Sequence, residues 1–405
     1  MFLETRDTFV QAMNPFEFFS VPRVVFGQGS CARLGALASA LGTSAMVISN
    51  AGEPGDRRLL DRLLPLLDEQ HVAWHFWRQS GEPQIPHVEQ ALTIARQGNC
   101  NLVIGIGGGS AIDVAKAVAG LLTNGGGPLD YMEVVGLGRA LDRPAAPWIA
   151  IPTTAGTGAE VTRNAVIGHP ERRFKASLRS PNLLATIALV DSELSRDVLQ
   201  EVTACSGMDA LCQLIESYTS IQSNPLCDAL ALQGIELALR SIRRAYAQRV
   251  DLAARDDMAL AALLSGITLT NAGLGAVHGF AAPLGAHLPI PHGAICAALL
   301  PHVMSANADA LMQESPEHPA LAKYATIGRM CAGQADLPAT IAIETAIGGI
   351  IELSEYLSIP RLAQFGLTST HIPELVDLAR KASSMRFNPA VLADSALADV
   401  LRKAL

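Results

Sequence analysis

The side chains best suited to holding a metal ion lie in the second half of this 405-residue chain. Asp209 and Gln213 are four residues apart in GMDALCQLIE, so one face of a helix would present both. His278 follows in the glycine-rich stretch GLGAVHGFAAPLG, and His292 comes directly after a proline in LPIPHGAIC. One carboxylate and two imidazoles suit Zn²⁺ or Fe²⁺ and leave coordination positions open. A simpler interpretation also fits, in which Asp209 stabilises a helix start and each histidine is an ordinary core residue.

A glycine-rich turn in the first half is typical of a nucleotide site. The stretch LVIGIGGGSAIDVAK runs from an apolar strand into Gly107, Gly108 and Gly109, after which Ser110 opens a helix. Glycines let the backbone turn tightly and approach a ligand closely, and N–H groups at a helix start favour a pyrophosphate. We place Asp113 in the first helical turn, where a carboxylate suits the helix dipole. Because the GxGxxG spacing is missing, an ordinary strand-to-helix turn fits these residues equally well.

A second loop, rich in hydroxyl groups, follows another apolar strand in IPTTAGTGAEVT. Thr153, Thr154 and Thr157 can donate hydrogen bonds to a phosphate, a ribose or a nicotinamide amide, although such a loop alone more often caps a helix. Two loops of this kind, each at the end of a parallel strand, indicate a shared crevice in which a ligand binds.

The elements that position these loops follow from the hydrophobic pattern. We predict strands at residues 24–26, 45–49, 102–106, 148–151 and 187–190, and helices at 87–97 and 111–122. This alternation indicates a parallel sheet covered by helices. Later helices are predicted at residues 211–220, 230–247, 252–270, 321–331, 341–356 and 372–382. We therefore predict a Rossmann-like α/β dinucleotide-binding domain over residues 1–194 and an all-helical metal- and substrate-binding domain over residues 195–405.

Composition restricts the compartment and the partners. With 49% hydrophobic and 17% charged residues, the composition is that of a globular protein. The formal charge of -8 does not favour binding to nucleic acid or to an anionic membrane. Glu4, Arg6 and Asp7 stand where a signal peptide would need an apolar stretch. The most membrane-like segment, residues 272–290, contains glycines and two prolines and fits a buried core helix followed by a loop. We expect a cytoplasmic protein with neither of these partners.

We predict that the cysteines are reduced thiols. There are seven of them, an odd number, and they are scattered without a CxxC pair, which is typical of a cytosolic protein without disulfides. Cys212 is singled out because it adjoins the candidate metal residues.

Taken together, these segments resemble the iron-containing (group III) alcohol dehydrogenase family. The resemblance runs nearly end to end, and its motifs occur in matching order: VPRVVFGQGS, GGGSAIDVAK, IPTTAGTGAEVT, GMDAL, HGFAAPLGAHLPIPHG and KASSMRFNP. It implies the dehydroquinate synthase-like two-domain architecture with a cleft between the domains. It also implies hydride transfer between NAD or NADP and a small alcohol or aldehyde, with Fe²⁺ or Zn²⁺ acting as a Lewis acid on the substrate oxygen. Self-association, as a homodimer, is expected from the resemblance alone.

The resemblance also implies roles for individual residues. His278 and His292 would be catalytic as metal ligands, together with Asp209 and, provisionally, Gln213; His287 is a provisional catalytic residue. Lys175 would lie near the ribose or nicotinamide, although a bare surface lysine is its ordinary reading. The residues expected to contact the cofactor are Asn50, Gly107, Gly108, Gly109, Ser110, Asp113, Thr153, Thr154, Thr157 and Lys175.

Three positions depart from the family pattern. Gln213 stands where the family has a histidine, and a glutamine carbonyl is a poorer ligand than imidazole. Ala282 replaces a second histidine that many relatives carry near the substrate, and His287 is the nearest replacement in the sequence. Asn50 occupies the position where NAD-selective relatives often have an aspartate, which leaves NAD and NADP equally open, with Arg57 or Arg58 available for a 2′-phosphate.

Other functions fit parts of the pattern. Reduction of an anionic carbonyl compound, as in the maleylacetate reductases, would use Arg179 as a carboxylate partner, although an exposed arginine is its ordinary role. A sugar-phosphate cyclase or lyase resembling dehydroquinate synthase shares the two-domain plan, but TTAGTG and HGxxxPLG fit dehydrogenases better. A binding protein that has lost catalysis would account for Gln213 and Ala282, but the retained metal-binding residues argue against it.

Overall fold

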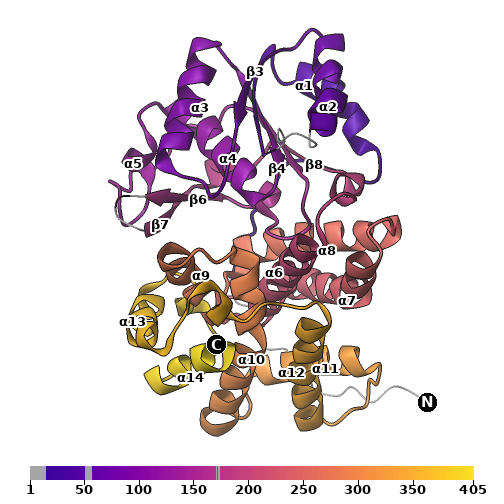
Figure 1. The fold of residues 1–405 in the computed structure, drawn as a ribbon, viewed down its shortest axis with the longest axis vertical. Helices are drawn as coiled ribbons and strands as arrows, with labels where there is room; N and C mark the ends of the chain where they lie inside the picture. The colour runs from indigo at the N-terminus through magenta and orange to yellow at the C-terminus, as the bar shows by residue number, and fades with distance from the viewer. Residues whose placement is uncertain (1–14, 51–56, 170, 172–173) are drawn as a thin grey trace, which may run out of the picture.

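The computed structural model describes residues 15–50, 57–169, 171 and 174–405. It contains both predicted parts, an α/β part followed by a helical part. Figure 1 shows a sheet flanked by helices in one half of the molecule and a group of packed helices in the other. The predicted fold class, a Rossmann-like α/β N-terminal domain followed by an all-helical C-terminal domain, is confirmed. Residues 1–14 lie outside the described residues, so the expectation that no signal peptide is present stays a prediction.

The main sheet has six strands within the described residues, in the order β1-β8-β5-β4-β2-β3, and all its pairings are parallel. The strands are β1 (Val24–Phe26), β2 (Ser44–Ser49), β3 (Ala73–Arg78), β4 (Leu102–Gly107), β5 (Trp148–Pro152) and β8 (Ile187–Val190). The helices of this domain are α1 (Leu34–Ser39), α2 (Arg57–Glu69), α3 (Ile85–Gln97), α4 (Gly109–Asn124) and α5 (Pro128–Tyr131). The five predicted strands and both predicted helices are confirmed, with small shifts at their ends.

Both faces of the sheet are buried, which explains why its strands are continuous apolar runs. In β2, Ala45 and Val47 pack with α1 and α2, whereas Met46 and Ile48 pack with α3 and α4 on the opposite face. Figure 1 shows these two pairs of helices on opposite sides of the sheet. Strand β3 and helix α2 were not predicted. The strand β3, AWHFWR, lies at the sheet edge and is only half-buried, and its histidine and arginine break the continuous apolar run of a central strand.

A two-stranded antiparallel hairpin, β6 (Asn164–His169) with β7 (Phe174–Arg179), was also missed by the sequence reasoning. It is anchored to α4, because the Asp113 carboxylate accepts a hydrogen bond from the Val166 N–H at 3.0 Å. Lys116, fully buried, pairs with Asp113 at 3.6 Å and donates to the Asn164 carbonyl at 2.7 Å. Helix α4 begins at Gly109, so Asp113 lies in its second turn and the predicted role at the helix dipole is wrong.

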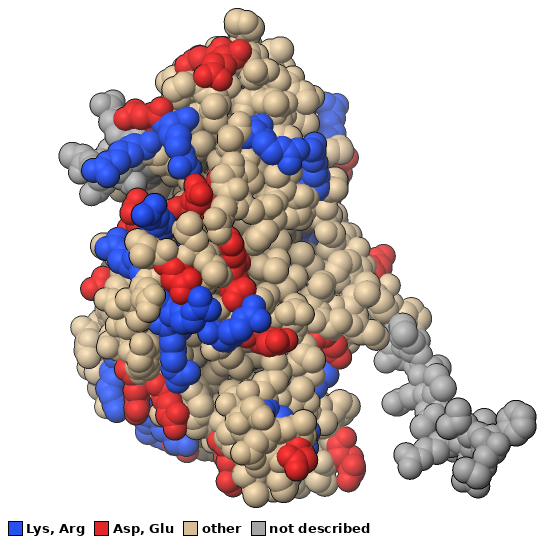
Figure 2. Space-filling view, turned by 90° about the vertical axis from the view of Figure 1, so that its right-hand side faces the viewer, with Lys and Arg blue, Asp and Glu red and all other residues tan. Residues whose placement is uncertain are grey.

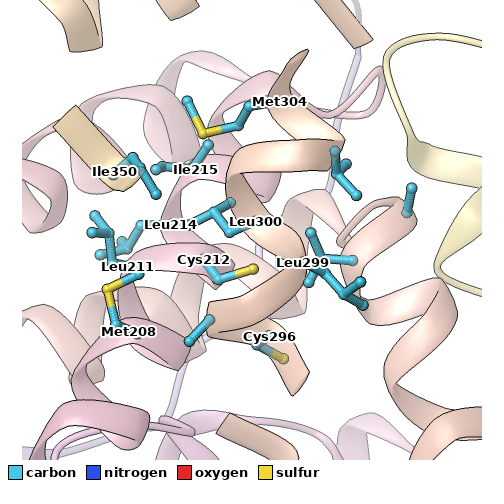
Figure 3. Close-up of a cluster of buried hydrophobic side chains, with 14 of the residues drawn as sticks. Met208, Leu211, Cys212, Leu214, Ile215, Cys296, Leu299, Leu300, Met304 and Ile350 are labelled. Carbon is cyan, nitrogen blue, oxygen red and sulfur yellow. The ribbon is translucent and has the colours of Figure 1, made fainter. Parts of the chain in front are cut away.

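The C-terminal domain is built from helices around one core. They are α6 (Gln200–Thr219), α7 (Pro225–Ala247), α8 (Leu252–Ala272), α9 (Ala276–His287), α10 (His292–Glu314), α11 (Pro319–Ala332), α12 (Ala339–Tyr356), α13 (Ile372–Lys381) and α14 (Asp394–Ala404). Figure 3 shows the contact of α6 with α10, where leucine, methionine and cysteine side chains interdigitate. The six later helices predicted from the sequence are all present.

Helix α6 begins at Gln200, well before the predicted start at residue 211. The residues that precede Leu211 are small or polar, so the apolar periodicity that marks a helix is weak there. Asp209 is therefore in the middle of the helix, and the interpretation of it as a helix-start residue is wrong.

One helix among the described residues, α10, is long and apolar enough to cross a membrane, and α8 with α9 passes the same test as a bent pair. The most apolar window of α10 is 61% buried inside the protein, as in the core helix of a soluble protein. Residues 272–290 do contain a core helix, α9, followed by a loop, as the sequence predicted.

Candidate metal and cofactor site

The glycine-rich turn joins β4 to α4 and is held from the side by Asn50, at the end of β2. Gly107 has φ +151, and a Cβ there would lie 2.2 Å from Asn50 Oδ1, so only glycine fits. Asn50 Oδ1 accepts a hydrogen bond from the Gly108 N–H at 2.9 Å, and its amide donates to Ser110 Oγ at 2.9 Å. Asn50 thus braces the turn, a role that the sequence reasoning did not assign to it.

The hydroxyl-rich loop after β5 lies directly against this turn. A Cβ on Gly109 would lie 3.0 Å from Thr157 Oγ1, and one on Gly108 would lie 3.5 Å from Thr154 Oγ1. The Thr153 N–H donates to the Gly107 carbonyl at 3.0 Å. The structure therefore brings the two predicted loops together at the carboxyl ends of neighbouring parallel strands.

Two residues that were predicted to contact the cofactor or to be catalytic make other contacts in the structure. Lys175 Nζ, on β7, forms an ion pair with Glu82 at 3.0 Å, and it would lie 3.3 Å from a Cβ on Gly285 of α9. His287, at the end of α9, contacts the Pro283 carbonyl through Nδ1 at 2.9 Å and is not part of the cluster that contains the other candidate ligands. The side chain of Arg57 lies outside the described part of the structure.

The three predicted metal residues meet at one point, although they come from α6, α9 and α10. Asp209 Oδ1 is 3.5 Å from His278 Nε2 and 3.7 Å from His292 Nε2. Asp209 is 2% exposed, and among the described residues its Oδ1 atom has no hydrogen-bond partner. A buried carboxylate oxygen without a partner is costly, so an ion that it can bind would satisfy it. The donor set and this oxygen fit a divalent metal.

A fourth group, which the sequence reasoning did not single out, completes this cluster. The Cys296 sulfur lies with the ligand atoms of Asp209, His278 and His292, all within 4.8 Å of one another. Cys212, the thiol singled out from the sequence, instead belongs to a neighbouring group with Glu216 and His278. The described cysteines are all free, as predicted.

Gln213 is turned away from this point. Its amide donates to Asp209 Oδ2 at 3.0 Å, and its Oε1 atom accepts from Ser265 Oγ at 2.8 Å. The reverse orientation of the amide would set its oxygen against the Asp209 carboxylate, which is unfavourable. Gln213 therefore holds one oxygen of Asp209 and leaves the other, Oδ1, to face the two imidazoles.

Glu216 is a second residue that sequence reasoning missed. Its carboxylate accepts hydrogen bonds from His278 Nδ1 at 2.5 Å and from the Val277 N–H at 2.7 Å. This holds a proton of His278 on Nδ1 and leaves Nε2 as the ring nitrogen on the side of Asp209. The signal was present in GMDALCQLIE, because Glu216 lies seven residues, or two turns, after Asp209 on the same helical face.

The groups in this cluster shift one another's proton affinity. The Cys296 sulfur and the Asp209 carboxylate raise the pKa of His292 to about 9, against the effect of burial. Burial opposes the charged form of His278, yet Cys296 and Glu216 raise its pKa well above the usual value. Burial also opposes the ionised form of Asp209, but His292 and His278 outweigh it and lower that pKa. The site thus favours positive charge at its centre.

The loop after β5 connects the two halves of the site. A Cβ on Gly156 would lie 2.7 Å from Ser206 Cβ, so this loop packs on α6 one turn before Asp209. Ser265 Oγ, which hydrogen-bonds to Gln213, lies 3.4 Å from the Gly156 carbonyl. The glycine turn and the metal cluster are therefore neighbours across the boundary of sheet and helices.

A parallel-sheet domain with a glycine turn, followed by a helical domain that gathers a carboxylate and two histidines, defines a two-domain dehydrogenase-like class of protein. The model of the family described as iron-containing alcohol dehydrogenase matches residues 22–192, and that of the Fe-containing alcohol dehydrogenase family, C-terminal, matches residues 203–405. The chain belongs to the iron-containing alcohol dehydrogenase family, whose members named here are oxidoreductases acting on CH–OH groups.

Relatives with different substrates share this plan. Choline dehydrogenase of Bacillus subtilis is 33% identical over 392 residues, covering 96% of this chain and 94% of that protein. A crystal structure of 1,3-propanediol oxidoreductase superposes with a TM-score of 0.89 at 31% identity, covering 97% of this chain and 100% of that one. Sulfoacetaldehyde reductase from Bifidobacterium kashiwanohense, solved with NAD⁺, has a TM-score of 0.82 at 26% identity, covering 96% and 98% of the two chains.

Proposed function

We propose that this protein is a metal-dependent, NAD(P)-linked alcohol dehydrogenase or aldehyde reductase that binds its metal through Asp209, His278 and His292. The observation that carries the proposal is the buried Asp209 Oδ1, which has no hydrogen-bond partner among the described residues and is faced by two imidazole nitrogens at 3.5 and 3.7 Å. A divalent metal held there would act as a Lewis acid toward the oxygen of an alcohol or carbonyl substrate.

Other residues of the site would orient the metal ligands and determine where the substrate enters. Glu216 and Gln213 orient the ligands His278 and Asp209 through buried hydrogen bonds. His292 is the exposed member of the cluster, with 41% of its side chain accessible, so a small substrate would enter on its side.

The cofactor is proposed to lie along the glycine turn and the loop that contains Thr154 and Thr157. The start of α4, a helix N-terminus, suits its pyrophosphate. The NAD⁺ complex of the related sulfoacetaldehyde reductase supports a nicotinamide dinucleotide. Asn50 faces the turn and carries no charge, so it repels no 2′-phosphate, and both NAD and NADP remain candidates.

The substrate is proposed to be a small alcohol or aldehyde. The relatives named above act on a cation, a neutral diol and an anion, so the shared fold does not fix the substrate charge. For an anionic substrate the sequence offered Arg179, but its guanidinium forms an ion pair with Glu133 at 3.2 Å. No contact of Arg179 in the described structure favours the maleylacetate reductase-like alternative.

Four further features are part of the proposal. The domain boundary is set at residue 195, between the last sheet strand, which ends at Val190, and α6, which starts at Gln200. The protein is proposed to be a cytoplasmic homodimer with no nucleic-acid or membrane partner. Figure 2 supports the absence of a nucleic-acid partner, because acidic and basic side chains are mixed over the face shown.

The test measures metal content and turnover on the same sample. Protein purified without chelator is analysed for iron and zinc and assayed for oxidation of NADH and NADPH with a panel of neutral, cationic and anionic aldehydes. Chelation should abolish turnover, and Fe²⁺ or Zn²⁺ should restore it. The isosteric change Asp209→Asn should lose both metal and turnover but keep nucleotide binding. No bound metal and no nicotinamide turnover after metal addition would overturn the proposal.

A further inference from the structure

The metal cluster contains one donor that the sequence did not indicate. Cys296 Sγ is 3.6 Å from His278 Nε2 and 3.7 Å from His292 Nε2. With Asp209 Oδ1, these atoms form a group of four in which every pair lies within 4.8 Å.

The helices explain why Cys296, and not Gln213, reaches this point. His292 and Cys296 are four residues apart in the first turns of α10, so they share one helical face, and both lie beside Asp209 of α6. Figure 3 shows Cys296 where α10 packs on α6. Gln213 has the same spacing from Asp209 on α6, but its oxygen is already bonded to Ser265. The oxygen of Gln213 is thus turned away from the group, whereas the thiol of Cys296 on the opposing helix lies within it.

The spacing of the four donors matches a tetrahedral site. Ligand atoms about 2.0–2.1 Å (nitrogen or oxygen) and about 2.3 Å (sulfur) from one ion lie roughly 3.3–3.6 Å from one another in a tetrahedron. The four pairs whose distances are known measure 3.5, 3.7, 3.6 and 3.7 Å. These four distances lie within a few tenths of an ångström of the tetrahedral values, and the other two pairs lie within 4.8 Å.

We propose that Cys296 is the fourth protein ligand of the metal and binds it as a thiolate beside Asp209, His278 and His292. The proposal deepens the proposed function, since it names a ligand of the same metal. As the sulfur–metal bond forms, the Sγ–H bond breaks and its proton leaves to solvent, without change of oxidation state. The accessible side of this group is at His292, so a substrate oxygen would approach a bound metal from there.

The alternative interpretation is that Cys296 is an ordinary buried core residue. Cys212 is a buried thiol of the same core and serves for comparison. Both thiols are fully buried in the α6–α10 core, as Figure 3 shows, but Cys212 is not in the group with Asp209 and His292. Cys212 is therefore the matched control for a thiol that packs here without belonging to the four-donor group.

The experiment replaces the metal in the full-length protein with Co²⁺ and records its absorption spectrum under reducing, anaerobic conditions. A thiolate ligand gives a sulfur-to-cobalt charge-transfer band in the near ultraviolet, which oxygen and nitrogen ligands do not give. We expect the band in the wild-type protein and in Cys212→Ser, and its loss in Cys296→Ser. Competition with a chelator should show at least a 100-fold weaker affinity in Cys296→Ser, since even loss of a residue that supports a ligand costs about 10–100-fold.

A second measurement covers the case in which Cys296→Ser does not fold. X-ray absorption of the zinc-loaded wild-type protein should show one sulfur at about 2.3 Å. Stoichiometric cobalt without the sulfur band, or a band that survives Cys296→Ser, overturns this proposal and leaves the proposed function intact. A wild-type protein that binds neither cobalt nor zinc overturns both.

Discussion

Replacing Glu216 by glutamine should weaken metal binding by changing which nitrogen of His278 carries the proton. In the native protein Glu216 accepts hydrogen bonds from His278 Nδ1 at 2.5 Å and from the Val277 N–H at 2.7 Å. A glutamine can satisfy the Val277 N–H with its oxygen, but it then presents an N–H₂ group to His278 Nδ1. The imidazole must then accept at Nδ1 and carry its proton on Nε2, where a metal would bind.

The size of the effect follows from these contacts. Turning the glutamine to restore the bond to His278 would set its N–H₂ group against the Val277 N–H, and a buried donor left unsatisfied costs about 1–3 kcal/mol. Each 1.4 kcal/mol is about a tenfold change in affinity. We therefore expect Glu216→Gln to weaken Zn²⁺ binding by about 10–100-fold, the range typical of residues that orient a metal-binding histidine.

The assay is competition with a coloured chelator, with nitrogen-15 NMR of the metal-free protein to report the His278 tautomer. Ser217→Ala is the matched control, because Ser217 is a buried neighbour on α6 whose hydroxyl donates only to the Gly273 carbonyl. The control should lose some stability and keep its metal affinity. A folded Glu216→Gln protein with native metal affinity and an Nδ1-protonated His278 would refute the reasoning.

The remaining predictions concern the cofactor half and the buried acid of the sheet domain. Gly107→Ala should lower the free energy of unfolding, measured by urea denaturation, by at least about 1–3 kcal/mol, because φ is +151 and the new Cβ would lie 2.2 Å from Asn50 Oδ1. The control is Gly348→Ala, which has open space around it and should not destabilise the protein. Asn50→Ala should raise the dissociation constant of NADH or NADPH about 3–10-fold in fluorescence titration, since the Gly108 N–H loses its 2.9 Å acceptor; an unchanged constant would contradict the bracing role. Burial raises the pKa of Glu160 from 4.5 to about 7, so the folded state holds this proton more tightly than the unfolded state and stability falls as pH rises between these values. Glu160→Gln should accordingly raise the melting temperature above pH 7, by an amount equivalent to about 1–3 kcal/mol, and change it little below pH 4.5; equal shifts at both ends would argue against this titration.

The sheet domain was largely predictable because hydrophobic runs reflect burial directly. Strands β4 and β5 are continuous apolar segments followed by glycine or threonine, and both the strands and their shared crevice were found. The edge strand β3 was not predicted because its half-buried apolar residues are interrupted by His75 and followed by Arg78. Asp113 was misplaced for another reason, since its partner on β6 is distant in the sequence and only the folded chain brings them together.

The candidate metal site was predictable for residues with a distinctive ligand chemistry and less so for the others. Asp209, His278 and His292 stood out by type and meet in the structure, whereas Cys296 looks like any apolar core residue until α10 packs on α6. The orientation of Gln213 could not be read from its spacing, because Ser265 on a third helix sets it.

Because the candidate ligands come from three helices, α6, α9 and α10, metal binding should stabilise the folded protein. Asp209 and His278 are far apart in the chain, so an unfolded chain would pay a large entropic cost to bring them together. An ion that binds only the native arrangement shifts the folding equilibrium by mass action, by about 4 kcal/mol when its free concentration is 1,000 times the dissociation constant. A cell short of metal would then hold less of this protein, because the unliganded helical domain opens more often and is exposed to proteases, before the loss of catalysis is counted.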